Sequence, residues 1–309
     1  MKKSILYILA IVVLSACTDS EATRQRIDRQ QRLEQRRQDS LALKIAVVPT
    51  LDGLPLFLAH EHRMFDTLGV DVRLRRYNAQ MDCDTAFRGG TVEGIVSDIV
   101  RTERFQHQGL RLKYVASTGE HWQLVASKRS RVSRLNQLGD KVVGITRFSA
   151  TDWLTNQCLE REKVKDNVYR VQINDVLIRL RMLLGNEIDA AWLSEPWATL
   201  ARQRGGVVLI DSSDRFSALG VIAFNVEAIR DKRRQKQLSL FLKGYNMACD
   251  SLNAHGLSAY ADVLKKYYRI DTKTIMALPK KHYKHATEPN SDNINKVASF
   301  VSTTIKPSY

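Results

Sequence analysis

The chain has 309 residues, which is too long for one small core and suits two domains of ordinary size. Its hydrophobic content of 44% and charged content of 26% are typical of a soluble globular protein. The net charge of +15 suits nucleic acid, an anionic membrane surface or anionic ligands. We discount nucleic acid, because the sequence has no basic block interleaved with aromatic residues, no zinc-finger spacing and no RNP-like run.

Met1 to Cys17 is predicted to be a targeting segment. Two lysines open it, and residues 5–14 form an apolar stretch too short to span a bilayer as a mature helix. It ends in Leu14-Ser15-Ala16-Cys17, which resembles a bacterial lipobox, whose cysteine receives lipid and becomes the new N-terminus. The alternative is an ordinary signal peptide with an incidental cysteine. The resemblance implies a lipid on Cys17 that anchors the protein in the cell envelope, in the periplasm or on the cell surface, without a spanning helix.

Residues 18–43 are predicted to be a charged tether and not a domain. The arm has neither Gly nor Pro up to Ser40, and Ile27 and Leu33 are nearly its only apolar residues. Gln, Arg and Glu favour helix, so we expect a solvated helix or a loose tether. As a helix it would hold the folded body roughly 30 Å from the lipid. Its positive residues could also lie on anionic headgroups.

The folded body is predicted to begin with an alternation of strands and helices. Apolar runs and apolar–polar alternation indicate strands, and Pro55 suits the first turn of a helix. The predicted strands cover residues 44–48, 70–77, 92–97 and 112–117, and the predicted helices run from Pro55 to about residue 65 and over 84–88 and 99–106. This alternation predicts a largely parallel, doubly wound sheet.

A second series of the same kind follows, and then the chain becomes almost wholly helical. The predicted strands cover residues 122–127, 142–145, 168–173, 188–193, 207–210 and 219–224. The predicted helices lie around 135–138, after the turn at 147–150, over 176–184 and after Glu195-Pro196, with two further apolar helical stripes and a final helix over 292–305. The fold class is therefore α/β with a helical C-terminal segment.

The turn from Arg147 to Thr151 is a candidate ligand site. It joins a predicted strand to a predicted helix, and Ser149 or Thr151 can cap that helix. Free backbone N–H groups, two hydroxyls and the positive end of a helix dipole then meet beside Arg147, a combination that favours an anionic group. The alternative is an ordinary helix cap that binds nothing.

Several motifs occur in an order and at spacings that carry a resemblance. They are Leu54-Pro-Leu-Phe-Leu-Ala followed by Gly69-Val-Asp-Val, Ala86-Phe-Arg-Gly-Gly followed by Ser97-Asp98, LNQLGDKVVG over 135–144, and LGNEIDAAWLSEPW over 184–197. Together they resemble the periplasmic substrate-binding proteins of ABC importers. The branch they resemble serves alkanesulfonates, taurine, nitrate and thiamine-pyrimidine precursors.

The resemblance implies a fold and a function. The fold is the type II fold of periplasmic binding proteins, with two α/β lobes joined by two crossing hinge strands, here near 122–126 and 219–224. Residues 44–121 and 222–309 would form one lobe, and residues 122–221 the other. The implied function is capture of a small molecule (a sulfonate, another oxyanion or a pyrimidine-like compound) and its delivery to an ABC permease and ATPase. The implied protein is a monomer, not an enzyme, and uses no cofactor or metal.

The ligand is expected in the cleft between the lobes, at the C-terminal ends of their strands, where open α/β sheets bind ligands in general. The expected ligand-binding residues are Thr50, Leu51, Asp52, Leu54, Ser97, Asp98, Glu120, Arg147, Ser149, Ala150, Thr151 and Glu195. The turn around Arg147 suits an oxyanion, whereas Asp98 and Glu195 suit an amine, an amidine-like heterocycle or an arginine partner. The ligand therefore stays open between these classes.

Two alternative functions remain at this stage. The same fold is used by a fungal pyrimidine synthase, but here Cys83, Cys158 and Cys249 are isolated, without CxxC pairing, and whether two of them form a disulfide stays open. The stretch His60-Glu61-His62 lacks the spacing of a zinc protease motif, and no GxSxG, Walker or GxGxxG motif is present. The second alternative is a receptor of the same fold that senses a ligand without transporting it.

Overall fold

The computed structural model describes residues 2–164 and 166–304, with side chains given for residue 21 and from residue 23 onward. It divides into two units, which meet between Ala42 and Leu43. The side chain of Cys17, the predicted lipidation site, lies outside the described residues.

The N-terminal unit is one helix, α1 (Lys2–Leu41). Almost all of its described side chains are exposed, including Ile27 and Leu33. The absence of Gly and Pro and the richness in Gln, Arg and Glu favour a helix in the arm that follows residue 17. Within the described part of the chain, no helix combines the length and the apolar character that crossing a membrane requires.

The second unit contains two five-stranded sheets. The first has the strand order β2-β1-β3-β10-β4. Its strands are β1 (Leu43–Val47), β2 (Val72–Arg76), β3 (Gly94–Asp98), β4 (Leu112–Ser117) and β10 (Gly220–Asn225). The first three strands are parallel, whereas β10 is antiparallel to both of its neighbours, β3 and β4.

The second sheet has the order β7-β6-β8-β5-β9. Its strands are β5 (Gln123–Ala126), β6 (Val142–Ile145), β7 (Tyr169–Gln172), β8 (Ala190–Leu193) and β9 (Val207–Asp211). Here β5 is antiparallel to both β8 and β9. Each sheet is therefore mixed but largely parallel, as expected, because four of its five strands run in one direction and only the strand that enters from the other sheet runs against its neighbours.

Helices cover both sheets. They are α2 (Leu54–Glu61), α3 (Met64–Thr67), α4 (Gln80–Arg88), α5 (Ile99–His107), α6 (Ala150–Glu162), α7 (Val176–Leu184) and α8 (Trp197–Gln203), followed by α9 (Lys232–His255), α10 (Ala261–Tyr268), α11 (Thr272–Met276) and α12 (Ser291–Thr304). The helix predicted from Pro55 to about residue 65 is two helices, because Arg63 adopts a left-handed conformation (φ 54°) between them. The helix predicted from Asp84 begins earlier, at Gln80.

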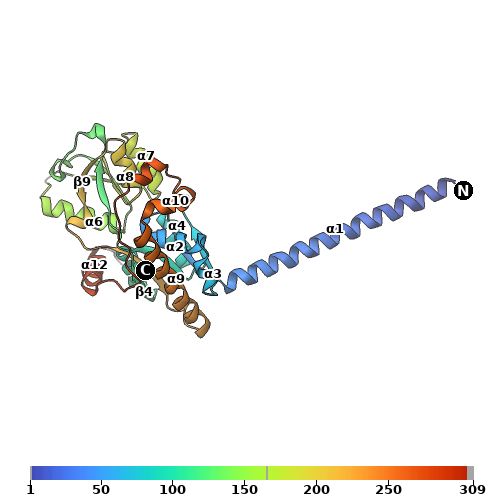
Figure 1. The fold of residues 1–309 in the computed structure, drawn as a ribbon. Coiled ribbons are helices and arrows are strands. Elements are labelled where there is room, and N and C mark those ends of the chain that lie inside the picture. The colour runs from blue at the N-terminus through green and yellow to red at the C-terminus, as the bar shows by residue number, and fades with distance from the viewer. Residues whose placement is uncertain (1, 165, 305–309) are drawn as a thin grey trace. The chain divides into compact units, whose positions relative to one another are not determined.

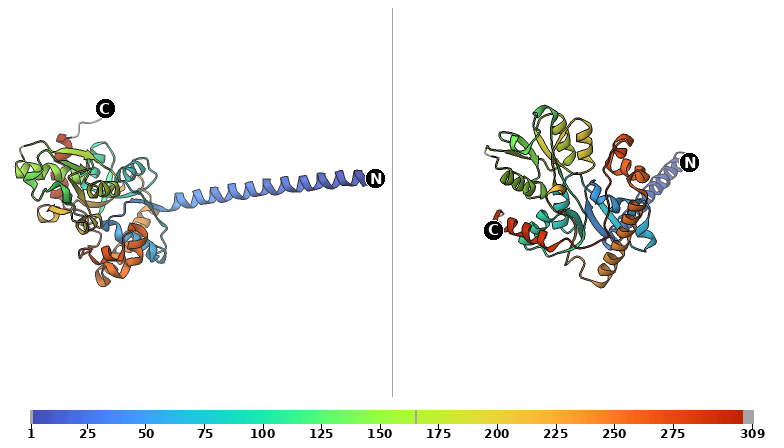
Figure 2. Two further views of the ribbon diagram at one scale, coloured as in Figure 1. Left: turned by 90° about the horizontal axis from the view of Figure 1, so that it is seen from above. Right: turned by 60° about the vertical axis from the view of Figure 1, so that its left-hand side comes forward.

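Within the described residues, the chain passes from the first sheet to the second over residues 118–122 and returns over residues 212–219. The two crossing segments are hydrogen-bonded to each other, since Trp122 N–H donates to Ser212 Oγ and Ser212 N–H donates to the Trp122 carbonyl, both at 2.8 Å. The strands of the second sheet, coloured green to yellow, gather apart from the blue and cyan strands of the first (Figures 1 and 2). The predicted hinge strands are β5 and β10, each of which directly follows a crossing.

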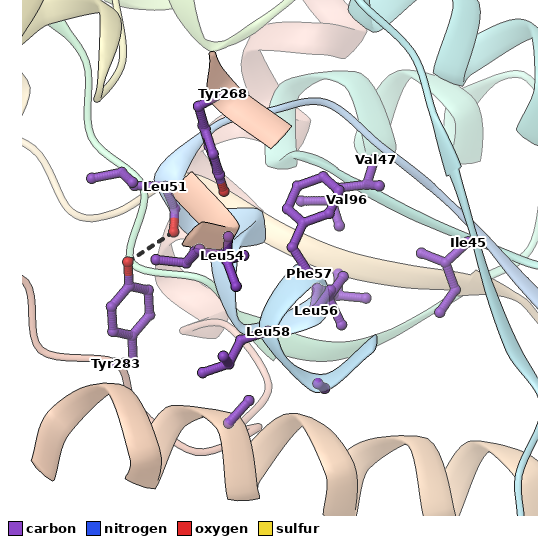
Figure 3. Close-up of a cluster of buried hydrophobic side chains, with 14 of the residues drawn as sticks. Ile45, Val47, Leu51, Leu54, Leu56, Phe57, Leu58, Val96, Tyr268 and Tyr283 are labelled. Atoms are coloured by element: carbon purple, nitrogen blue, oxygen red, sulfur yellow. Dashed lines mark hydrogen bonds between the residues drawn. The ribbon is translucent and has the colours of Figure 1, made fainter. Parts of the chain in front are cut away.

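The C-terminal segment packs against the first sheet and supports the turn that follows β1. Phe241 of α9 stacks against Phe65 of α3 at 5.8 Å between ring centres. The Tyr268 hydroxyl donates to the Thr50 carbonyl at 2.9 Å, and the Tyr283 hydroxyl donates to the Leu51 carbonyl at 3.0 Å. Figure 3 shows the two tyrosines on either side of this turn. The turn that follows β1 is therefore held by residues more than two hundred positions away.

Candidate ligand-binding site

A cavity of about 80 Å³ lies between the two sheets. Most of its lining residues are polar, and they lie at or after the C-terminal ends of β1, β2 and β3 in the first sheet and of β6, β7 and β8 in the second, or in the crossing segment 118–122. The lining residues are Val48, Thr50, Asp52, Asn78, Gln80, Val96, Ser97, Asp98, Arg101, Glu120, Trp122, Thr146, Ser149, Thr151, Asn174, Val176, Arg179 and Ser194. Both sheets thus contribute to one cavity at the edge where α/β sheets bind ligands.

Asp98 connects the two sheets across this cavity. As the N-cap of α5 it accepts from Arg101 N–H at 3.0 Å, and the same oxygen accepts from Ala150 N–H at the start of α6, also at 3.0 Å. The N-terminus of α6, where the sequence predicts an anion, therefore receives a carboxylate of the protein itself. Burial raises the pKa of Asp98 to about 6, although the Arg101 guanidinium opposes this rise.

Arg101 lies on the first turn of α5 with 3% of its surface exposed. Its guanidinium pairs with Asp84 and lies 3.5 Å from Asp98. Its Nε and Nη2 atoms have no hydrogen-bond partner among the described residues, and Arg101 lines the cavity. A buried donor without a partner costs free energy, so these atoms favour a ligand with an acceptor group.

Arg179 is the second buried guanidinium of the cavity wall. Its hydrogen bonds within the described residues go to uncharged oxygens: the carbonyl of Ile173 at 3.1 Å, the carbonyl of Trp192 at 2.9 Å and the hydroxyl of Thr146. Burial lowers its pKa to about 9. Arg179 therefore ties together the ends of β6, β7 and β8 and acts as a positioning residue for that half of the site.

Two further acids, Asp52 and Glu120, line the cavity. Asp52 accepts from the hydroxyls of Thr50 and Thr118, the latter at 3.1 Å. Glu120 lies 3.6 Å from the ammonium of Lys281, and its Oε1 atom has no partner among the described residues. Burial raises the pKa of Asp52, and burial followed by the charge of Asp52 raises the pKa of Glu120 well above its usual range.

The turn before α6 is largely occupied with its own hydrogen bonds. Ser149 Oγ donates to the Thr146 carbonyl at 2.6 Å and accepts from Thr151 N–H at 3.2 Å. Thr151 Oγ1 accepts from Thr146 N–H at 2.9 Å. Both hydroxyls still line the cavity. Arg147, by contrast, is exposed and outside the lining, with its guanidinium 5.2 Å from the Phe148 ring centre.

Glu195 lies in a neighbouring cavity of about 200 Å³, together with Leu51. Its carboxylate accepts from Thr199 N–H at 3.0 Å and pairs with Arg202 at 2.9 Å, which makes it a helix-terminal charge of α8. Leu54 is fully buried in the hydrophobic core.

Of the twelve residues predicted for the site, the cavity thus brings together seven: Thr50, Asp52, Ser97, Asp98, Glu120, Ser149 and Thr151. Leu51, Leu54, Arg147, Ala150 and Glu195 lie outside its lining.

Sequence reasoning missed both guanidinium groups and several amides of the wall. Asn78 and Asn174 follow the ends of β2 and β7, so the rule that selected Ser97 and Thr50 would have found them. Arg179 shares the buried face of α7 with Leu180 and Leu183, and an arginine on an apolar face was an available signal. Arg101 follows Asp98 by three residues, the spacing at which a cap receives a backbone donor.

Two mixed α/β sheets, two crossings between them and a polar cavity at the strand ends define the class of two-lobed periplasmic binding proteins. Solved structures share this fold. The ligand-binding component of an ABC-type import system from Staphylococcus aureus, with zinc bound, is 16% identical with a TM-score of 0.71, covering 85% of this chain and 91% of that one. The aliphatic sulphonate binding protein SsuA from Escherichia coli is 15% identical with a TM-score of 0.69, covering 85% and 92%. The alkanesulfonate-binding protein SsuA from Xanthomonas axonopodis pv. citri, bound to MOPS, is 14% identical with a TM-score of 0.71, covering 85% and 91%.

The chain belongs to the NMT1/THI5-like family, whose family model matches residues 51–264. Residues 1–18 match the prokaryotic membrane lipoprotein lipid attachment site, which confirms the predicted lipobox and a lipid-anchored location in the cell envelope. Among curated proteins, none matches this chain.

Proposed function

We propose that this protein is a lipid-anchored solute-binding protein that captures a small molecule in the cavity between its sheets and delivers it to the permease and ATPase of an ABC importer. The observation that carries the proposal is the cavity, because its polar wall comes from strand ends of both sheets. Family membership, the lipid attachment site and solved structures named as binding proteins of import systems support it.

The proposed mechanism is closure of two lobes around the solute. The lobes would be residues 44–121 with 222–309, and residues 122–221. Direct contacts link the two sheets beside the cavity: Asp98 with Ala150 N–H, and Leu51 N–H with the Glu195 carbonyl at 3.0 Å. A solute that contacts both halves stabilises the closed form by its higher affinity for that form. The permease would then recognise the closed shape.

The site proposal combines the seven cavity residues from the sequence prediction with the guanidinium groups of Arg101 and Arg179. Of the remaining five predicted residues, Ala150 and Leu51 contribute backbone N–H groups beside the cavity and Glu195 lies in the neighbouring cavity, whereas Leu54 packs in the core and Arg147 is exposed. No catalytic step, cofactor or metal is part of it, and the protein is proposed to act as a monomer tethered by the lipid on Cys17.

The test measures compaction and transport with the full-length protein. Native mass spectrometry first identifies any small molecule that co-purifies with it. Small-angle scattering then measures the radius of gyration with and without that molecule, and with a panel of small amines, pyrimidines and sulfonates. We expect at least one compound to bind and to compact the protein, and its uptake by cells to require the gene. A protein that binds no compound and never compacts would refute the proposed function.

A further inference from the structure

The acid pair of the cavity carries more negative charge than its surroundings neutralise. Asp52 and Glu120 would contribute two negative charges, and Lys281 contributes one positive charge at 3.6 Å from Glu120. The next acid that acts on Glu120 is Glu195, which is already paired with Arg202 at 2.9 Å. One negative charge at this end of the cavity therefore has no counter-charge among the described residues.

The uncharged neighbours stabilise the pair only in part. Thr50 and Thr118 donate to Asp52, and the Ser194 hydroxyl faces Glu120. Burial, and after it the charges of Asp52 and Glu120 among others, raises the pKa values of Tyr268 and Tyr283, and both hydroxyls already donate to backbone carbonyls. The Oε1 atom of the buried Glu120 is left without a donor. Two ionised carboxylates at this depth are costly, so one bound proton is the state with the lower free energy.

The other end of the cavity has a different balance. The guanidinium of Arg101 pairs with Asp84 and lies 3.5 Å from Asp98, and Arg179 adds a second positive charge to the lining. The N-terminus of α6 already receives Asp98. What remains open there are the Nε and Nη2 donors of Arg101. This end can accept a hydrogen-bond acceptor, either neutral or anionic.

We infer that the cavity recognises a small molecule through a protonated nitrogen that pairs with Asp52 and Glu120, and that this nitrogen replaces a proton which one of the two carboxyl groups holds in the ligand-free protein. An acceptor group of the same molecule meets Arg101. The inference deepens the proposed function and rests on it. A cavity of about 80 Å³ limits the molecule to a small one, since each ordered water needs about 10–15 Å³ by the same measure.

Because the ligand cation replaces a carboxyl proton, the affinity for the ligand is expected to rise with pH. Binding of the cation requires both acids to be ionised, so the proton held by one of them leaves for solvent when the ligand enters. Affinity therefore rises by about tenfold per pH unit as long as the free pair holds its proton, and levels off above that range. A ligand recognised only as an anion would show the opposite trend or none.

The proton is tested first, on ligand-free full-length protein with ¹³C-labelled Asp and Glu carboxyl groups. Near neutral pH we expect carbon NMR to show one carboxyl group still protonated, and we expect Glu120→Gln to abolish that signal. Glu61→Gln is the control, because Glu61 is an acid outside the cavity that pairs with Lys266. Two fully ionised carboxylates in the native protein would overturn the inference.

Ligand recognition is tested with matched probes that differ only in the nitrogen. Calorimetry compares ethanolamine with ethylene glycol and β-alanine with propionate, in buffers of different ionisation enthalpy. We expect the nitrogen-containing member to bind at least about tenfold more tightly, with release of one proton, and Glu120→Gln to remove both the preference and the proton release. Equal binding, or no binding, by both members of both pairs would overturn the inference.

The outcome also separates this inference from the proposed function. Compaction of the protein by propionate or methanesulfonate, unaffected by Glu120→Gln, would leave solute binding intact and refute recognition of a cation. Absence of compaction with every compound would refute solute binding itself.

Discussion

At the scale of single residues, the site is organised by buried charges whose partners lie far apart in the sequence. Asp98 receives one donor from its own helix and one from the first residue of α6, fifty-two positions later. Arg179 collects oxygens from the ends of three strands. Each of these side chains serves as a structural link and as part of the cavity wall, so its substitution is expected to alter both stability and binding.

Asp98 gives a prediction for stability against pH. Its pKa in the folded protein, about 6, lies above the ordinary value of 3.8, so the folded state holds this proton more tightly than the unfolded state. The tighter binding of this proton stabilises the folded state. This stabilisation is therefore present in full below about pH 4 and is lost as pH rises through 6. Asp98→Asn keeps an oxygen for both N–H donors and removes the titration. We expect this variant to be more stable than the native protein at pH 7.5, by about 1–3 kcal/mol.

Urea unfolding at pH 4.5, 6.0 and 7.5 measures this difference. The gap between variant and native protein should widen with pH. A gap that stays constant over the three pH values would show that Asp98 does not titrate in this window.

Arg179 gives a second prediction at this scale. Arg179→Met keeps the apolar stem but removes the guanidinium donor from the Trp192 carbonyl and from the Ile173 carbonyl, which then keeps only the Thr146 hydroxyl at 3.4 Å. We expect a loss of about 3 kcal/mol in the free energy of unfolding, since each orphaned buried group costs about 1–3 kcal/mol. Arg181→Met, on the exposed side of the same helix, should change stability by less than about 0.5 kcal/mol. Similar losses in both variants would argue that α7 tolerates no methionine, and would remove the support for this role of Arg179.

At the scale of elements, the turn after β1 shows how separate segments build one site. Residues 51–53 form a short 3-10 helix that leads directly into α2. Leu54 and Phe57 of α2 are fully buried in the core. The turn is held by tyrosines that belong to α10 and to the segment after α11. Because Asp52 lies in this turn, the position of the carboxylate depends on the C-terminal third of the chain.

Tyr283→Phe tests that dependence. The change removes only the hydroxyl that donates to the Leu51 carbonyl at 3.0 Å. We expect a loss of about 1 kcal/mol in stability and a weaker affinity for the bound solute, because the carbonyl is left buried and the turn is less constrained. Thermal unfolding and a binding titration measure the two effects. Tyr169→Phe, at an exposed tyrosine, is the matched control and should change neither.

At the scale of the whole molecule, membrane attachment and the cavity belong to different parts of the chain. The attachment site at residues 1–18 fixes the chain to a membrane, and the described side chains of α1 are mostly exposed. The body carries the cavity. This division predicts that membrane association and solute binding can be separated by one substitution.

Cys17→Ala makes that separation. Without the lipid we expect the protein to move from the membrane fraction to the soluble fraction, because acyl chains supply the membrane affinity at about 0.8 kcal/mol per buried CH₂ group. Solute affinity should stay unchanged. Fractionation and a binding titration check both expectations, and Cys158→Ala controls for the loss of a cysteine. A Cys17→Ala protein that remains in the membrane would show that another part of the chain holds it there.

The sequence predicted most elements because their signals are local. The strand predicted over 112–117 and the helix predicted over 176–184 agree with β4 and α7 at both ends. The helix that begins at Gln80 was predicted too late, since its first turn is polar and lacks an apolar stripe. The break at Arg63 was missed because the residue types around it do not indicate that its backbone adopts a left-handed conformation. The family assignment is confirmed, and it came from the order of motifs and not from any single one.

By itself, the amino-acid sequence determined the fold class, the family and the lipid attachment site, because apolar periodicity and short motifs are properties of neighbouring residues. Only the tertiary structure decided which polar residues meet. It placed Arg147 outside the cavity and Asp98 at the helix terminus expected to hold an anion. It also brought Asp52, Glu120 and Lys281 to one place. The reason is that the balance of charge in a buried cavity depends on distances between segments far apart in the chain.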